Sequence, residues 1–179
     1  MPGCDIFQTR PPDRPVQGTS SYQVPDRPEV VLSNLKAAIA ESNADNYIRC
    51  FADTSNASEP FKFTPSPEVG SAYASIFRTW TIADERIYFQ NLGKPDNGTP
   101  LMSDSLRSFS NSSDSVIYTL DYTLYYPHRR QNIPQLVGGQ MQLLLKPDSR
   151  RLWFIQSWQD YKTTRDSTWS YIKAVFSAN

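Results

Sequence analysis

The sequence is poor in the residues that metal sites and nucleophilic sites most often use, with one histidine and two cysteines among 179 residues. These three residues show no recognisable metal-ligand spacing, and no D-x-D-x-D-G calcium loop is present. A G-x-S-x-G nucleophile motif and a glycine-rich phosphate loop are also missing. We therefore expect no metal site and no cofactor, and we name no catalytic residue.

An excess of charge and long apolar runs are missing as well. Eighteen Lys and Arg residues balance eighteen Asp and Glu residues. Such a chain lacks the basic footprint of nucleic-acid-binding proteins, and we expect no nucleic-acid partner. No stretch approaches the 18 apolar residues that predict a membrane-spanning helix. We also expect no cleavable secretory signal in the three residues ahead of Cys4.

Proline, by contrast, is concentrated at the N-terminus, where residues 1–28 hold six of the fourteen prolines. Proline cannot donate a backbone hydrogen bond and fixes its own φ angle, which favours a stiff spacer over a core element. We predict a tail or tether over residues 1–25 and a single folded domain over residues 26–179.

The pair Gly3-Cys4 looks like the last two positions of a bacterial lipobox, where cleavage leaves an N-terminal cysteine that is diacylated. On this interpretation Cys4 is the lipidation site, and residues 1–3 are a remnant ahead of the mature start. The protein would then be a periplasmic or outer-membrane lipoprotein, anchored by lipid in the bacterial cell envelope. The alternative is that Cys4 is an ordinary thiol.

Helical patterns dominate the first half of the domain. Asp26 and Glu29 are placed like a helix N-cap and its partner, and apolar residues then recur at helical spacing up to Ile39. Asn43 is placed to cap a second, short helix. The apolar side of that helix includes Cys50, which we interpret as a buried, inert thiol.

A short strand and a longer helical region follow. Phe61-Lys62-Phe63 alternates between two prolines, which is typical of a strand. Ser66 precedes a proline and starts a helix, and Thr81 with Asp84 resembles a second cap inside the same apolar pattern. We therefore expect this helix to bend or restart at Thr81 and to end near Leu92.

The second half changes to a period of two residues. Residues 115–126, 136–146 and 151–162 alternate apolar and polar positions, and a weaker strand pattern covers 101–110. Gly138-Gly139 lies inside one of these strands and indicates a bulge or a sharp bend.

A final helix is expected over residues 167–176. Helices that precede a strand meander define an α+β domain. A sheet that wraps around a helix curves, which leaves a cone with an open mouth.

Several segments then carry a resemblance to a known family. They are 28–35, 46–51, 61–65, Trp80 with Glu85, and 153–160. Through them the chain resembles the NTF2-like (SnoaL-like) superfamily and, within it, small bacterial lipoproteins of unassigned function. The resemblance implies an α+β NTF2-like cone, with N-terminal helices packed on a curved antiparallel sheet. The C-terminal helix would be an addition to the minimal cone.

The resemblance also implies that the cone is a pocket lined by tyrosine or tryptophan. An apolar or sugar-like ligand would suit such a lining. The alternative is that the same aromatic residues form the core between the sheet and the helices. The candidate ligand-binding residues are Tyr118, Tyr122, Tyr126, Gln140, Gln142, Trp153, Trp158 and Asp160.

Enzymes of this superfamily place a carboxylate or a His–Asp pair in the cone. The single histidine, His128, follows a strand in a polar segment, where we expect an exposed turn and not a catalytic pair. Asp160 and Glu85 remain as candidate acid–base groups, since both adjoin tryptophans. Their alternative role is an ion pair or an acceptor for N–H groups.

The first hypothesis is a non-enzymatic, envelope-associated lipoprotein domain that binds an unidentified ligand or protein partner. One alternative is a subunit of a larger envelope or filament assembly, with a homodimer or an envelope protein as partner. The other is a small NTF2-like acid–base enzyme that uses Asp160 or Glu85. The sequence leaves open whether the chain is an enzyme and favours a non-enzyme.

Overall fold

The computed structural model describes residues 21–178 except 54, 56 and 58. Cys4 and most of the tail predicted over residues 1–25 therefore lie outside the described residues.

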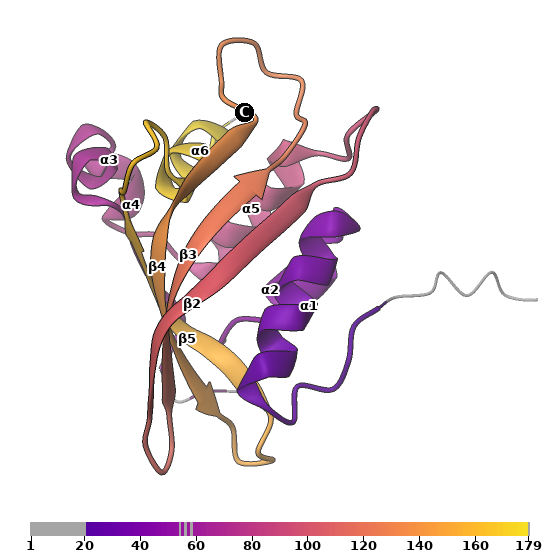
Figure 1. Ribbon diagram of the computed structural model, residues 1–179, viewed down its shortest axis with the longest axis vertical. Helices are drawn as coiled ribbons and strands as arrows, with labels where there is room; N and C mark the ends of the chain where they lie inside the picture. The colour runs from indigo at the N-terminus through magenta and orange to yellow at the C-terminus, as the bar shows by residue number, and fades with distance from the viewer. Residues whose placement is uncertain (1–20, 54, 56, 58, 179) are drawn as a thin grey trace, which may run out of the picture.

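Within the described residues, helices come first and last, and the long strands lie between them (Figure 1). The order agrees with the one predicted from the sequence. The elements are α1 Pro28–Ala40, α2 Ala44–Ile48, β1 Lys62–Thr64, α3 Pro67–Ala72, α4 Ala74–Phe77, α5 Ile82–Leu92, β2 Leu101–Asn111, β3 Val116–Tyr125, β4 Leu136–Pro147, β5 Trp153–Tyr161 and α6 Trp169–Phe176.

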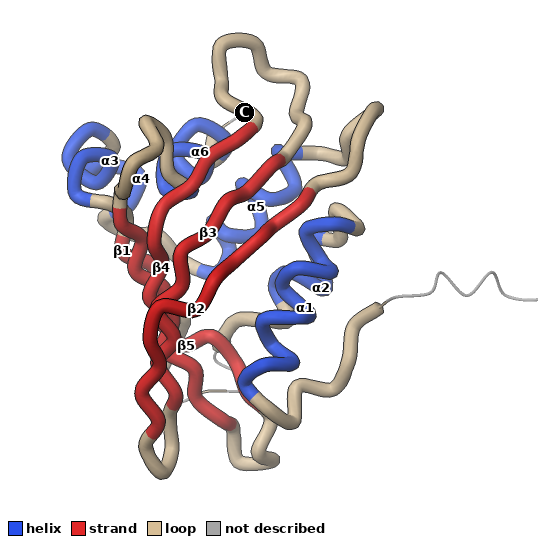
Figure 2. The backbone as a smooth tube through the Cα atoms, in the orientation of Figure 1, coloured by secondary structure: helices blue, strands red, loops and turns tan. Residues whose placement is uncertain are grey.

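The described strands form one curved five-stranded sheet with the order β1-β5-β4-β3-β2 (Figure 2). Strands β2 to β5 pair antiparallel, as the four-strand meander predicts. The short β1 adds to the far edge in parallel with β5, with Phe63 opposite Trp158. The sheet is therefore mixed and unclosed, and the predicted α+β cone is confirmed.

Strand β3 shows how the period of two places side chains. Val116, Tyr118, Leu120, Tyr122 and Leu124 are buried, while the residues between them are only partly buried. The buried face of the sheet packs against the helices, and α5 contacts α6 on this side. This concave side of the sheet holds the core.

Gly138 and Gly139 form no bulge, which was one of the two alternatives that we predicted besides a sharp bend. They pair regularly with Thr123 and Tyr122 of β3, and the register shifts of this sheet occur elsewhere. A Cβ at position 139 would lie 2.4 Å from the Tyr161 carbonyl oxygen and 3.1 Å from the Tyr122 hydroxyl. Glycine is needed there because β5 and the Tyr122 ring approach the backbone closely.

Helix boundaries follow local capping chemistry. The N-cap of α1 is Arg27 and not Asp26 as predicted, and it makes no side-chain capping bond. The side chain of Asn43 accepts from the Asn46 amide and caps α2 as expected. The predicted restart at Thr81 is confirmed, because Thr81 and Asp84 form a capping box at the start of α5.

The segment ahead of α1 is attached to the domain by backbone groups. The Gln23 amide donates to Asn34 Oδ1 at 2.9 Å, and Asn34 Nδ2 donates to the Gln23 carbonyl at 2.7 Å. The Trp153 amide donates to the Pro25 carbonyl at 2.8 Å. Residues 21–25 thus run along α1 to the start of β5.

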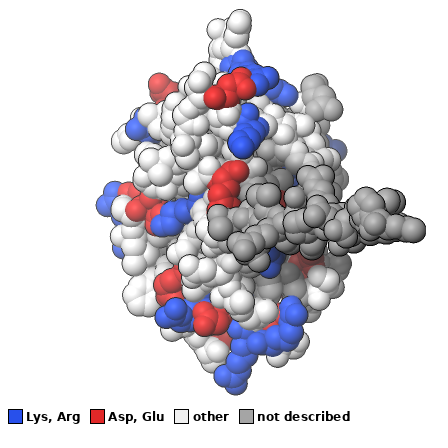
Figure 3. All heavy atoms as spheres, turned by 90° about the vertical axis from the view of Figure 1, so that its right-hand side faces the viewer, with Lys and Arg blue, Asp and Glu red and all other residues white. Residues whose placement is uncertain are grey.

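Charges are mixed over the surface. On the face in Figure 3, Lys and Arg lie beside Asp and Glu at several places. Ion pairs at the protein surface include Lys36–Asp104 and Arg107–Asp121. Among the described residues, the helices are all too short or too polar to cross a bilayer.

Candidate functional site

The interior of the cone contains a fully buried ion pair. Glu85 of α5 and Lys173 of α6 are both 0% exposed, and Lys173 Nζ donates to Glu85 Oε1. Trp80 Nε1 donates to the same oxygen at 2.9 Å, and the Tyr47 hydroxyl donates to Oε2 at 3.0 Å. Three donors therefore hold the Glu85 carboxylate.

Aromatic rings surround the ammonium group of Lys173. Its Nζ lies 4.1 Å from the ring centroids of Phe63 and Trp158, and 5.1 Å from that of Tyr88. Burial lowers the pKa of Lys173 to about 8, against the opposing effect of Glu85. The carboxylate and the ring faces together stabilise the cation away from water.

A second buried carboxylate lies on β5. Asp160 is 0% exposed, and its Oδ1 accepts from the Tyr122 hydroxyl at 2.8 Å. The amide and the hydroxyl of Ser170 both donate to Oδ2. Burial raises the pKa of Asp160, and the bonds from Ser170 and Tyr122 oppose that shift.

Hydrogen bonds join the two carboxylates into one network. Trp169 Nε1 donates to the Tyr88 hydroxyl at 2.9 Å, and that hydroxyl lies 3.1 Å from the Tyr47 hydroxyl bound to Glu85. The Trp169 amide donates to the Tyr122 hydroxyl at 2.7 Å. Burial raises the pKa of Tyr47, Tyr88 and Tyr122, which keeps their hydroxyls protonated.

Helix α6 closes this interior by supplying Trp169, Ser170 and Lys173 to the network. A general acid or base needs hydrogen-bond reach to its substrate. Glu85 and Asp160 have no solvent exposure and already accept bonds from protein donors. In this arrangement the carboxylate of Glu85 attaches α6 to α5, and that of Asp160 attaches α6 to β5. Among the described residues, no cluster of His, Cys, Asp and Glu could hold a metal ion.

The structure separates the candidate ligand-binding residues into groups. Tyr118, Tyr122, Trp158 and Asp160 are buried on the concave face. The Tyr126 hydroxyl donates to the Gly93 carbonyl at 2.7 Å.

The remaining three residues lie elsewhere. Gln140 and Gln142 pair with Asp121 and Thr119, on the opposite, outer face of the sheet. Trp153 is partly buried at the start of β5. The eight residues therefore do not line one common cavity.

His128 is not in the exposed turn that we predicted. Its side chain is buried, and the ring lies 4.9 Å from that of Phe176 at the end of α6. Nε2 lies 3.2 Å from the Pro134 carbonyl, and burial lowers the pKa of His128. The physical reason is that α6 covers the segment around His128. The polar sequence of that segment did not indicate this cover.

Sequence reasoning missed Lys173 as a part of the interior. It lies four residues after Trp169 and next to Ile172, on the buried side of the helix. The position of this lysine within the apolar stripe of the helix was the sequence signal that could have indicated its burial. Glu85 was selected because it adjoins Trp80, and the structure places it in an ion pair, the alternative role considered for it.

Several solved structures of other proteins are similar to this fold. A candidate scytalone dehydratase from Novosphingobium aromaticivorans is similar over 76% of this chain and 81% of its own, at 9% identity and a TM-score of 0.56. An NTF2-like superfamily protein from Salmonella enterica is similar over 76% and 89%, at 10% identity and a TM-score of 0.52. The chain has the NTF2-like fold.

A further structural neighbour is a Mycobacterium tuberculosis protein of unknown function, at 13% identity and a TM-score of 0.51, which is similar over 77% of this chain and 75% of its own. The neighbours thus include proteins named for enzymes and proteins of unknown function. The sequence matches no protein-family model and no curated protein.

Proposed function

We propose that this NTF2-like chain is a non-enzymatic binding domain, held at the bacterial cell envelope through a lipid on Cys4. The observation that carries the proposal is the closed cone interior. Lys173 and Trp169 of α6 occupy it, and Glu85 and Asp160 are bonded to protein groups. A ligand or a protein partner would therefore bind on the outside of the cone. The pair Gly3-Cys4, followed by a proline-rich segment, supports the lipid anchor.

Expression of the native gene in its own host tests the anchor. We expect a product that begins at Cys4, carries the mass of its acyl chains and sediments with membranes. The matched control is Cys4→Ser, which should remain unacylated and leave the membrane fraction. An unmodified protein that begins at Met1 and does not sediment with membranes would overturn the envelope location.

A subunit role is a second candidate, favoured by an apolar row on the outer face of the sheet. Leu101 pairs with Tyr125, and Tyr125 pairs with Leu136. All three side chains are exposed. A second copy of this chain would cover the row, so light scattering of the purified protein should show a dimer that Leu101→Ser with Leu136→Ser dissociates. A strict monomer at high concentration would contradict this role.

A further inference from the structure

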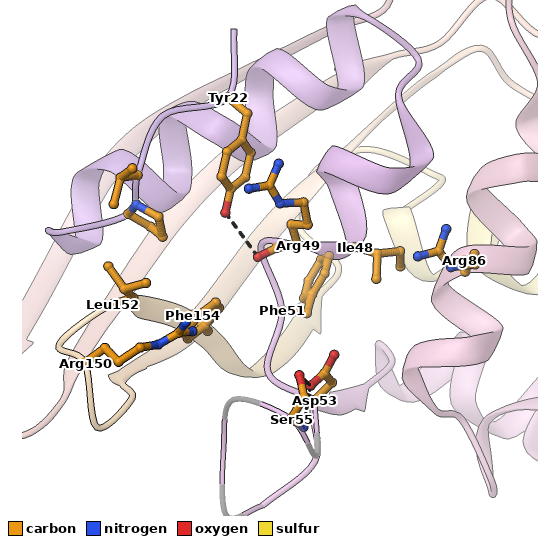
Figure 4. A pocket seen from close by; sticks show the side chains of 12 residues that line it. Tyr22, Ile48, Arg49, Phe51, Asp53, Ser55, Arg86, Arg150, Leu152 and Phe154 are labelled. Carbon is orange, nitrogen blue, oxygen red and sulfur yellow. Dashed lines mark hydrogen bonds between the residues drawn. The ribbon is translucent and has the colours of Figure 1, made fainter. Parts of the chain in front are cut away.

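A surface pocket of about 690 Å³ lies outside the closed interior. Its walls come from three parts of the chain: residues 22–25, the end of α2 with the residues after it, and the turn from β4 into β5 (Figure 4). Arg86 of α5 adds to the rim. The volume is in the range of sites that take small molecules.

The floor of this pocket is apolar. Phe51 and Phe154 line it and are themselves buried. Ile48 and Leu152 line it as well and keep part of their surface in solvent. An apolar ligand body would remove this surface from water, which favours binding.

Three arginines surround this floor: Arg49, Arg86 and Arg150. Arg49 lies with its guanidinium 3.7 Å from the Tyr22 ring centroid and makes no ion pair with any residue that the structure describes. Arg86 pairs with Asp45, whose side chain is 82% exposed. An ion pair so open to water exchanges partners readily.

Negative charge is scarcer on the lining. Asp53 is the acidic residue among the described lining residues, and its Oδ1 accepts from the amide and the hydroxyl of Ser55. Arg150 pairs with Asp148, which lies outside the lining. Because Arg86 and Arg150 already pair with Asp45 and Asp148, Arg49 is the lining guanidinium without an ion-pair partner among the described residues, and it complements an anion.

We propose that this pocket binds an amphipathic organic anion. Its carboxylate would pair with the guanidinium of Arg49, whose planar set of donors matches two carboxylate oxygens. Its apolar body would lie on Phe51 and Phe154. This inference rests on the proposed binding function and names the ligand class for it.

Calorimetric titration of the full chain with decanoate tests the proposal. We expect saturable one-site binding, with decanol about tenfold weaker because it lacks the carboxylate, and decylammonium weaker still. Inorganic phosphate, which lacks the apolar body, should also bind at least about tenfold more weakly. Equal affinity for decanol and decanoate would overturn the proposal, as would equal affinity for phosphate.

Variants locate the site. Arg49→Gln should weaken decanoate binding about tenfold, while Arg78→Gln, an exposed arginine outside the lining, should leave it unchanged. Val24 is 68% exposed on the pocket wall. Val24→Asp should weaken decanoate binding, and its uncharged match Val24→Asn should not.

Circular dichroism establishes that each variant is folded. Absence of saturable decanoate binding, or identical binding by Arg49→Gln and wild type, would overturn the proposal. Acylation of Cys4 is measured separately, so failure of this site leaves the envelope location standing, and the reverse also holds.

Discussion

Among single residues, Lys173 stands out because burial of its ammonium group costs free energy. Moving an ammonium group out of water is expensive, and only a close carboxylate with further hydrogen bonds offsets it. Glu85 supplies that carboxylate, and Trp80 and Tyr47 supply donors to its oxygens. The pair therefore fixes the position of α6 more than it increases stability.

We expect Lys173→Met to lower the free energy of unfolding by about 3–5 kcal/mol, because it leaves the Glu85 carboxylate buried without its cation. The double variant Glu85→Gln with Lys173→Met should regain most of that loss and lie within about 2 kcal/mol of wild type. Urea unfolding of the variants measures both values. A double variant less stable than the single one would contradict the ion-pair account.

The pH dependence has a definite sign. Lys173 has a pKa of about 8 in the folded protein, below its ordinary 10.5. Below pH 8, Lys173 is protonated in both the folded and the unfolded protein. As pH rises from about 8 towards 10, the unfolded chain keeps the proton that the folded protein has lost, so the free energy of unfolding increases.

The increase in the free energy of unfolding between pH 8 and 10 should appear as a difference between wild type and the Glu85→Gln, Lys173→Met variant, which lacks both charged groups. Burial is the main cause of the raised pKa of Tyr47, Tyr88 and Cys50, so below pH 10 these groups stay protonated in both folded proteins and their titration cancels in the difference. Urea unfolding at several pH values between 7 and 10 measures it, and a difference that stays flat or falls would refute the lowered pKa.

The environment of single side chains was the hardest feature to predict from the sequence. His128 lies in a polar segment, and its burial depends on Phe176, which is far along the chain. The partners of Asp160 come from β3 and α6, so local sequence could not identify them. Tryptophan neighbours did select Glu85 and Asp160, because large aromatic residues mark the core.

At the scale of elements, the close approach of β4 and β5 depends on Gly139. A methyl group there would meet the Tyr161 carbonyl oxygen at 2.4 Å, a backbone atom that cannot turn aside. It would also press on the Tyr122 hydroxyl, which bonds Asp160.

We expect Gly139→Ala to lower the free energy of unfolding by about 1–3 kcal/mol, because β5 must shift to relieve the contact. Gly70→Ala in α3 is the control. There the nearest atom is a side-chain carbon of Pro65 at 3.0 Å, and the helix gains about 1 kcal/mol from alanine. Thermal unfolding compares the two, and an equal effect would contradict the role given to Gly139.

Most elements could be predicted from the sequence because their signals are local. Strand β3 alternates without interruption, and Asn43 and Thr81 begin helices through bonds to residues three positions away. The short β1 shows what local signals lack, since its parallel pairing with β5 depends on a contact across the fold. Of the bulge or sharp bend expected at Gly138-Gly139, the bulge is absent for the same reason, because Gly139 is required by the close approach of the neighbouring strand β5.

At the scale of the whole molecule, Cys50 reports on global unfolding. It is buried, its Sγ lies 3.4 Å from the Asn46 carbonyl oxygen, and burial raises the pKa of its thiol far above the usual range. A thiol in this state reacts only after it becomes exposed and ionised. Its reactivity therefore follows the opening of the domain.

In a Cys4→Ser chain, we expect iodoacetamide to label Cys50 only at the rate at which the protein opens, so denaturant should accelerate labelling steeply. Mass spectrometry of quenched samples measures the rate. A peptide that contains the same cysteine gives the rate of an exposed thiol. Labelling of the native protein at the peptide's rate would show that the thiol is accessible.

The attachment of residues 21–25 has a mechanical consequence. The Gln23–Asn34 pair and the Pro25–Trp153 bond hold this segment on the domain, and the same segment forms one wall of the arginine-lined pocket. Tension applied to the chain ahead of Ser21 would load these few hydrogen bonds before it reaches the sheet. These hydrogen bonds would break first, so that a pull on the chain ahead of Ser21 would open the pocket wall while the core stays folded.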